Sequence, residues 1–198
     1  MDFNFEEEII LEDERVLLRP LKADDYNVLQ PVAFEDPTLT KYSPSQIGSQ
    51  ELLQKHIQQA LDDRQNKVRY AFVIFDKEKQ QYAGSTSLAA ISNKDLRLEI
   101  GWTWLGRVFQ RTGLNRHCKF LLMQYVFDTL SFERVELKTD ERNVQSRTAI
   151  QKIGGKEEGI LRSHTLMSDG FRRNTVYYSI LKEEWCELKN NFFQRDNN

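Results

Sequence analysis

One segment, residues 96–130, limits the folds open to this chain more than any other. Apolar and polar residues alternate over residues 96–105, which is typical of a strand. A loop with one glycine follows, and apolar residues then recur at helical spacing over residues 116–130. We therefore predict a strand, a tight loop and a helix in succession. On the strand we expect an apolar core face of Leu98, Ile100, Trp102 and Trp104, and an opposite face of Glu99, Gly101 and Thr103.

The rest of the chain alternates between strand and helix patterns. We predict strands at residues 16–20, 70–75, 82–91, 135–139, 156–167 and 174–181. Helices are expected from residue 23, where Pro31 should kink or shorten the helix, after a Ser49 cap, and at residues 146–153. This order predicts one α/β domain with a mixed sheet (an α+β arrangement) over residues 15–187. Residues 1–14 form an N-terminal extension, and the polar residues 188–198 are expected to fray.

Length and charge exclude several classes of protein. The chain has 198 residues, enough for a core that needs no metal or disulfide, and a formal net charge of −2. Without a basic field or an apolar run of about 18 residues, we expect neither nucleic acid nor a membrane as a partner. Two cysteines favour the cytoplasm, and Cys118 falls on the buried face of its helix. The three histidines lack metal-binding spacing, so no metal is expected.

The loop at residues 110–116 has the properties of an anion site. At a helix start the first backbone N–H groups lack helical partners and the helix dipole is positive. Glycine also lets the backbone approach an anion closely. No Asp or Glu occurs between residues 100 and 127, although the chain contains 30 of them, and the same window carries Arg107, Arg111, Arg116, His117 and Lys119. The pattern favours a phosphate-binding loop over a solvated basic turn.

The residues of this loop resemble a known motif. Gln110-Arg111-Thr112-Gly113-Leu114-Asn115 looks like the Gln/Arg-x-x-Gly-x-Gly/Ala pyrophosphate loop of the GNAT acetyltransferases. Asn115 stands where the family has Gly or Ala, and Gly155 stands where the family has Phe. The likeness extends over about residues 15–185. Residues 99–102, 143–146, 149–154, 158–162 and 176–185 resemble, in order, the branch that contains the ribosomal-protein N-terminal acetyltransferases.

The resemblance implies a fold and a cofactor. The fold is a single GNAT domain whose sheet is strongly twisted and mostly antiparallel, with splayed central strands and helices on both faces. The cofactor is acetyl-CoA, the acetyl donor. Its pyrophosphate is expected to contact Gln110, Arg111, Thr112, Gly113, Leu114, Asn115 and Arg116. Further cofactor contacts are expected from the backbone of Thr103, Trp104 and Leu105 and from Asn143 and Ser146.

The same resemblance suggests how the chemistry proceeds. Glu99 matches the strand glutamate that acts as general base in the histone acetyltransferase branch, and partial burial should raise its pKa toward neutrality. Alternatively, Glu99 is structural and pairs with Arg97 or with a neighbouring strand. Many family members donate a proton from a tyrosine where this chain has Ile150, so the leaving sulfur would take its proton from water or from Ser146. Asn143 contacts the cofactor or caps its helix.

We therefore expect an acetyltransferase that acts on a primary amine, either a protein N-terminus or a small molecule. The resemblance also allows a homodimer. A module that holds acyl-CoA without turnover is the main alternative, and a dinucleotide-binding protein is disfavoured because Gly-x-Gly-x-x-Gly is missing. The acceptor pocket should be walled by residues 38–49, 87–92 and 162–173.

Overall fold

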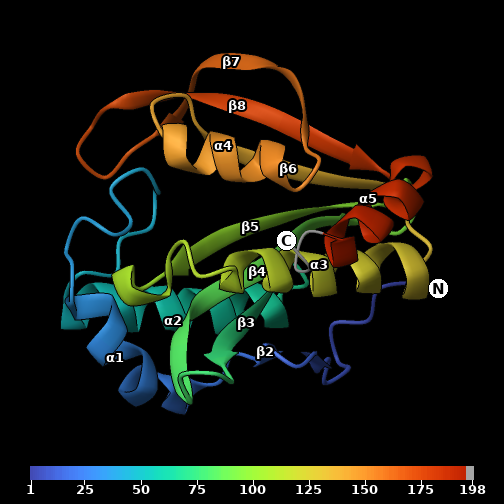
Figure 1. Cartoon of the computed structure of the whole chain (residues 1–198). Helices are drawn as coiled ribbons and strands as arrows, with labels where there is room; N and C mark the ends of the chain where they lie inside the picture. The colour runs from blue at the N-terminus through green and yellow to red at the C-terminus, as the bar shows by residue number, and fades with distance from the viewer. Residues whose placement is uncertain (195–198) are drawn as a thin grey trace.

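The computed structural model describes residues 1–194, and in them a single eight-stranded sheet runs through the molecule (Figure 1). The strand order is β1-β2-β3-β4-β5-β6-β8-β7. The strands are β1 (Leu11–Glu12), β2 (Val16–Pro20), β3 (Arg69–Asp76), β4 (Gln81–Ser92), β5 (Arg97–Leu105), β6 (Arg134–Asp140), β7 (Lys156–Leu166) and β8 (Arg172–Leu181). The helices are α1 (Tyr26–Phe34), α2 (Gln50–Gln65), α3 (Leu114–Gln124), α4 (Val144–Lys152) and α5 (Lys182–Gln194).

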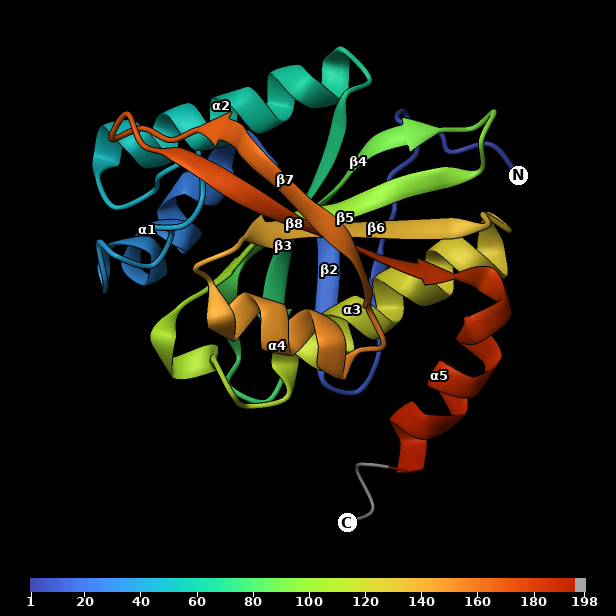
Figure 2. The ribbon, with the colours of Figure 1, turned by 90° about the horizontal axis from the view of Figure 1, so that it is seen from above.

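Helices cover both faces of this sheet, as the sequence predicts. Figure 2 shows α1 and α2 on one side and α3, α4 and α5 on the other. We call these sides the α2 face and the α3 face. Each has its own apolar core, because strand side chains alternate between the two sides. Leu29, Leu53 and Val73 belong to the core of the α2 face, and Leu98, Leu122 and Tyr178 belong to that of the α3 face.

The centre of the sheet is splayed. Strands β5 and β6 are the one parallel pair among the described strands, and they pair only at Arg97↔Arg134, Leu98↔Val135 and Glu99↔Glu136. Both strands continue beyond that point, β5 to Leu105 and β6 to Asp140. Figure 1 shows them close together near α5 and separating toward the opposite end. The β6-facing edge of β5 therefore lacks a strand partner after Glu99.

The predicted faces of β5 are wrong beyond Gly101, because the strand contains a bulge. The register with β4 shifts between Ser87↔Gly101 and Ser85↔Trp104, and Trp102 has a positive φ of 50°. An extra residue in one strand turns the following side chains to the opposite side. Trp104 consequently packs in the core of the α2 face, whereas Thr103 points to the α3 face and contacts Lys119. Trp102 is not a core residue, since it is 38% exposed.

Both ends of the chain are more ordered than the sequence predicts. Phe3 and Ile9 of the N-terminal extension are buried in the core of the α3 face, and Leu11 and Glu12 pair with β2. Helix α5 occupies residues 182–194, so helix replaces the expected fraying up to Gln194. Residues 195–198 of the expected tail lie outside the described residues. Within the described part of the chain, no helix combines the length and apolar character needed to cross a membrane.

Other helix ends follow local sequence signals. Ser49 caps α2 as predicted, with its Oγ accepting a hydrogen bond from the Leu52 N–H at 3.3 Å. Helix α1 continues through Pro31 for one further turn before it ends at Phe34. Helix α3 begins at Leu114, two residues earlier than predicted, and passes into a π-helical turn over Tyr125–Thr129. The earlier start places the loop directly at the helix N-terminus.

Candidate active site

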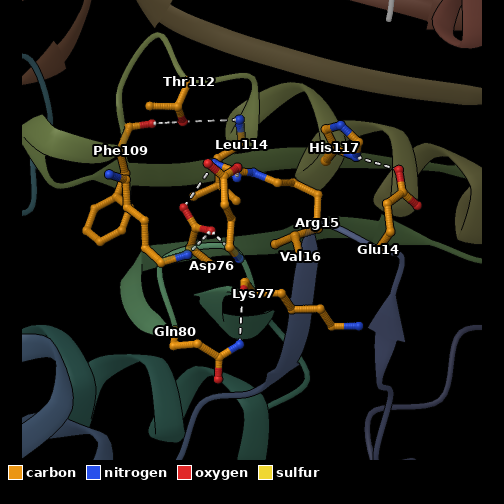
Figure 3. Close-up of polar contacts among 12 residues, drawn as sticks. Glu14, Arg15, Val16, Asp76, Lys77, Gln80, Phe109, Thr112, Leu114 and His117 are labelled. Carbon is orange, nitrogen blue, oxygen red and sulfur yellow. Dashed lines mark hydrogen bonds and ion pairs between the residues drawn. The ribbon is translucent and has the colours of Figure 1, made fainter.

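The loop before α3 presents unpaired backbone donors. Gly113, the N-cap residue of α3, has φ = 87°, and Arg111 has φ = 62°. Within the described residues, nothing accepts a hydrogen bond from the backbone N–H of Thr112, Gly113 or Asn115. Thr112 folds back instead, since its Oγ1 donates to the Phe109 carbonyl at 2.8 Å (Figure 3). Among the described residues these N–H groups, at the positive end of α3, have no acceptor, an arrangement that suits an anion.

Glycine suits this loop for two reasons. A left-handed backbone conformation costs a residue with a side chain roughly 1–2 kcal/mol. A Cβ at Gly113 would meet no heavy atom within 4 Å, so the space beside the loop is open. A ligand can therefore reach the backbone at this point without displacing protein atoms.

Gln110 fixes the loop to its neighbours. Its Nε2 donates to the Leu105 carbonyl at the end of β5, at 2.9 Å. Its Oε1 accepts from Nε2 of Gln145, in the first turn of α4, at 3.1 Å. Asn115 turns inward, because its amide oxygen is buried and lacks a hydrogen-bond partner among the described residues. The Asn115 side chain thus does not lie over the outer surface of the loop.

The basic side chains of this window are not all available to an anion. Arg107 Nε forms an ion pair with Asp36 from the α1–α2 connection. Arg116 lies over the Phe192 ring at 4.6 Å. Arg111 is exposed on the loop. The backbone N–H groups therefore contribute more to the site than the count of arginines suggests.

Glu99 lies at the apex of the splay, on the α2 face. It is 5% exposed, and its Oε2 lies 2.6 Å from Lys138 Nζ on β6. Arg97, one of the two partners suggested by the sequence, pairs with Asp95 and Glu136 instead, whereas the other suggestion, a partner on a neighbouring strand, is confirmed by Lys138 of β6. Burial raises the pKa of Glu99 above its ordinary value, although the Lys138 ammonium acts in the opposite direction. Glu99 is thus a buried carboxylate that is paired yet still easier to protonate than a free one.

Helix α4 closes the other side of the splay. Asn143 is its N-cap, with Oδ1 accepting from the Ser146 N–H at 3.1 Å, as the capping alternative predicts. Ser146 is half-buried in the first turn. Ile150 is buried in the core of the α3 face, and its Cγ2 would lie 2.5 Å from a Cβ at Gly155. A phenylalanine at position 155 would therefore not fit this arrangement.

Several buried polar atoms on the α2 face lack partners. They are Ser85 Oγ and Ser87 Oγ on β4 and Trp104 Nε1 on β5, none of which forms a hydrogen bond among the described residues. Ser87 pairs with Gly101 and Ser85 with Trp104, so the unpaired atoms lie along the β4–β5 pair on the same face as Glu99. Unpaired buried polar groups are rare in folded proteins and often mark positions filled by ligand or water.

Two of the expected acceptor walls meet above this face. Arg173 Nη1 of β8 donates to the Tyr42 carbonyl of the α1–α2 connection at 2.9 Å. The Arg142 guanidinium lies 3.9 Å from the Phe171 ring centre and 5.7 Å from that of Tyr42. The connection and the β7–β8 hairpin therefore form a bridge over one end of the splay, as Figure 1 shows.

Sequence reasoning missed the roles of Lys138, Thr86 and Lys119. Lys119 is 6% exposed, and its Nζ donates to Thr103 Oγ1 at 2.6 Å. The available signal was a lysine among the apolar residues of a helix. Its contact with Thr103 could not be predicted, because the bulge in β5 turns Thr103 toward it. The sequence also did not predict that His117 Nδ1 of α3 lies 2.7 Å from Oδ2 of Asp13. Cys118 is fully buried, as predicted.

Comparisons with known proteins place this arrangement in a family. Residues 15–156 match the model described as "Acetyltransferase (GNAT) domain". An uncharacterized N-acetyltransferase, p20, of Bacillus licheniformis is 28% identical over 178 residues, which cover 87% of this chain and 96% of that protein. A GCN5-related N-acetyltransferase structure from Brucella melitensis is 27% identical with a TM-score of 0.88, covering 95% of this chain and 85% of that one.

Another similar structure is too distant in sequence to support more than the shared fold. It is a Salmonella typhimurium acetyltransferase, 21% identical with a TM-score of 0.77, covering 87% of this chain and 99% of that one. That enzyme is described as modifying the N-terminal serine of a protein of the 50S ribosomal subunit. The family match spans well over half of this sequence, and the splayed sheet and helix-start loop agree with it. The chain belongs to the GNAT family and is an acetyl-CoA-dependent N-acetyltransferase.

Proposed function

We propose that this protein transfers an acetyl group from acetyl-CoA to a primary amine that enters from the α2 face. The observation that carries the proposal is the unpaired edge of β5. This edge starts beside Glu99 and ends at the loop of unpaired N–H groups before α3. This strand edge thus leads from the buried carboxylate of Glu99 to Leu105, which Gln110 links to the loop before α3.

The residues present fit the cofactor. Thr112, Gly113 and Asn115 offer backbone N–H groups to the pyrophosphate, and the open space beside Gly113 admits it. Backbone groups of Thr103, Trp104 and Leu105 that face the edge without a β6 partner can bind an extended polar arm as a strand would, apart from the Leu105 carbonyl, which accepts from Gln110 Nε2. Asn143 and Ser146 lie at the start of α4, which Gln145 links to the loop. Bound acetyl-CoA supplies an acetyl group activated as a thioester.

Two tasks fall to the chain itself. Glu99, ionised and held by Lys138, accepts the proton that the acceptor amine must lose. Backbone N–H groups of β5 beyond the bulge stabilise negative charge on the thioester oxygen, because they are oriented before the reaction begins. The bulge is needed for the second task, since it redirects the strand where β6 has diverged.

The acceptor is expected to use the unpaired hydroxyls of Ser85 and Ser87 and the indole N–H of Trp104. These groups suit an acceptor with hydrogen-bonding atoms close to its amine, as a peptide N-terminus has. The Salmonella relative acts on such an N-terminus. We therefore propose peptide N-termini as the first acceptors to test and small amines as the second.

The test is release of free thiol from acetyl-CoA, measured with a panel of peptides and small amines. Saturating CoA should also stabilise the protein by roughly 1–3 kcal/mol in thermal unfolding. Amine-dependent thiol release supports the proposal, and the same peptides with blocked N-termini serve as controls. Binding of CoA without turnover on any amine would favour an acyl-CoA-binding module instead. Absence of any thermal shift at millimolar CoA would contradict both.

A further inference from the structure

Lys119 is a buried ammonium that has no carboxylate partner among the described residues. Among the described residues, no Asp or Glu oxygen lies within ion-pair distance of its Nζ, whereas buried Arg69 pairs with Asp63 at 2.8 Å. The recorded contact of Lys119 is with a neutral hydroxyl, Thr103 Oγ1. Burying a charge without an opposite charge destabilises a fold, and an apolar residue would avoid that cost. A purely structural role does not explain a lysine here.

The position of this lysine is informative. Its partner Thr103 lies on β5 within the stretch that no longer pairs with β6. Thr103 Oγ1 is also 2.8 Å from Thr86 Oγ1 of β4, so the three groups form a short chain of hydrogen bonds. Because of the bulge, Thr103 and Lys119 are on the α3 face and Glu99 is on the α2 face. One strand therefore separates a buried carboxylate from a buried ammonium.

The surroundings of Lys119 favour loss of its proton near neutral pH. Burial lowers the pKa of Lys119 to about 8, against weaker opposing effects of Cys118 on α3 and Glu99 on β5. Thr86 of β4, which contacts Thr103 Oγ1, is uncharged. An ammonium of this acidity is still mostly protonated at neutral pH and can release its proton readily.

We propose that Lys119, acting through the hydroxyl of Thr103, supplies the proton to the sulfur that leaves when the acetyl group is transferred. The inference rests on the proposed function. Lys119 Nζ passes a proton to Thr103 Oγ1, and Thr103 passes its own hydroxyl proton to the sulfur, which keeps the electron pair of the broken C–S bond. Glu99 takes the amine proton on the opposite face as the C–N bond forms. Lys119 is left neutral and regains a proton from solvent.

This assignment fills a gap on α4. Ile150, the buried residue of α4, has no side-chain proton that it could donate. Ser146 Oγ makes no hydrogen bond to the described residues, so no charged hydrogen-bond partner among them could return a proton to it. Thr103 has such a group at 2.6 Å. Lys119 is a positioning residue in this scheme, and Thr103 is the group that meets the sulfur.

The experiment compares two ligands that differ only in the sulfur. Isothermal titration calorimetry measures the Kd of CoA and of desulfo-CoA at pH 8, for the wild type, Lys119→Met and Thr103→Val. A protonated Lys119 should favour the thiolate of CoA, so CoA should bind the wild type more tightly than desulfo-CoA, by about threefold at pH 8 if the thiol pKa falls by one unit from about 8.5. Both variants should bind the two ligands about equally. An exposed lysine on the β4–β5 turn, changed as Lys94→Met, is the matched control and should keep the wild-type ratio.

A second readout is the pH profile of turnover. The wild-type rate should fall as pH rises through about 8, where Lys119 loses its proton, and this alkaline limb should vanish in Lys119→Met. Equal CoA to desulfo-CoA ratios in wild type and Lys119→Met, or an unchanged alkaline limb, would overturn the assignment. Wild-type protein that binds both ligands but transfers no acetyl group would instead refute the proposed function. The calorimetric comparison remains valid in that case.

Discussion

Glu99 and Lys119 are both buried, one on β5 and the other in contact with it, but among the described residues only Glu99 has an oppositely charged partner. Glu99 has an ammonium 2.6 Å away, on the α2 face where β5 and β6 still meet. Among the described residues, the polar contact of Lys119 is a hydroxyl at 2.6 Å, on the α3 face where the two strands have diverged. Both groups have their pKa moved toward neutrality by burial, upward for the acid and downward for the base.

The difference shows which charge stabilises the structure and which depends on a ligand. A paired carboxylate can stay ionised in the resting protein, ready to accept a proton. An unpaired ammonium lacks an anion that would favour its charged form, and a thiolate would supply one. The splay of the sheet explains why only Glu99 has a charged partner. Beyond Glu99, β6 no longer lies beside β5, so no β6 side chain can place a carboxylate next to Thr103 and Lys119. The following changes test the two sides of the comparison.

The largest effect is expected from Glu99→Gln. The variant keeps the side-chain shape and loses proton acceptance, so turnover should fall by about 10²-fold or more. The loss should shrink as pH rises, because more of the amine is already neutral, and the Kd of CoA should stay within a few-fold. Steady-state kinetics and CoA titration measure these quantities. A variant that melts early but turns over normally would make Glu99 a structural partner of Lys138.

Lys119→Met should stabilise the protein at pH 7, in contrast to the usual loss on changing a buried residue. The native Lys119 loses its proton at about 8, whereas the unfolded chain does so at about 10.5, so wild-type stability should rise with pH between these values. At pH 7 the buried charge costs up to about 3 kcal/mol. Urea unfolding at pH 7 and pH 9.5 should therefore show a gain that shrinks at the higher pH. A loss of stability at pH 7 would contradict an uncompensated charge.

Gly113→Val should weaken CoA binding at least tenfold, because a branched side chain occupies the open space beside the anion site. The strained backbone should also lower stability by roughly 1–2 kcal/mol. Gly170→Val is the matched control, since Gly170 has a similar φ of 82° and likewise no heavy atom near its Cβ position. Equal loss of CoA affinity in both variants would mean that strain, and not the loop, is responsible.

The smallest effect is expected from Lys138→Met, which would make Glu99 as unpaired as Lys119. Burial would then raise the pKa of Glu99 further, because the opposing ammonium is gone. Since the base must be ionised, the acid limb of the rate profile should move to higher pH. We expect a few-fold loss of turnover on the acid side of the profile that recovers as pH rises. Identical profiles in the two proteins would show that Lys138 does not control the ionisation of Glu99.

Local patterns were sufficient for much of the fold. Strand and helix positions, the Ser49 cap and the glycine at the start of α3 follow from interactions between residues close in sequence, so periodicity and turn chemistry predict them. The loop was found for the same reason, because its donors come from consecutive backbone N–H groups. Helix α5 was missed because its packing, for example Leu188 against Gly154, depends on contacts distant in sequence.

The sequence by itself determined the order of elements, the loop and the candidates Glu99, Asn143 and Ser146. Only the tertiary structure decided which face each side chain of β5 occupies, because one bulge residue at Trp102 reverses the alternation and no local signal marks it. The structure likewise decided that Lys138 and not Arg97 pairs with Glu99. It also placed Lys119 under Thr103, because α3 packs against strands whose positions are set by the whole sheet.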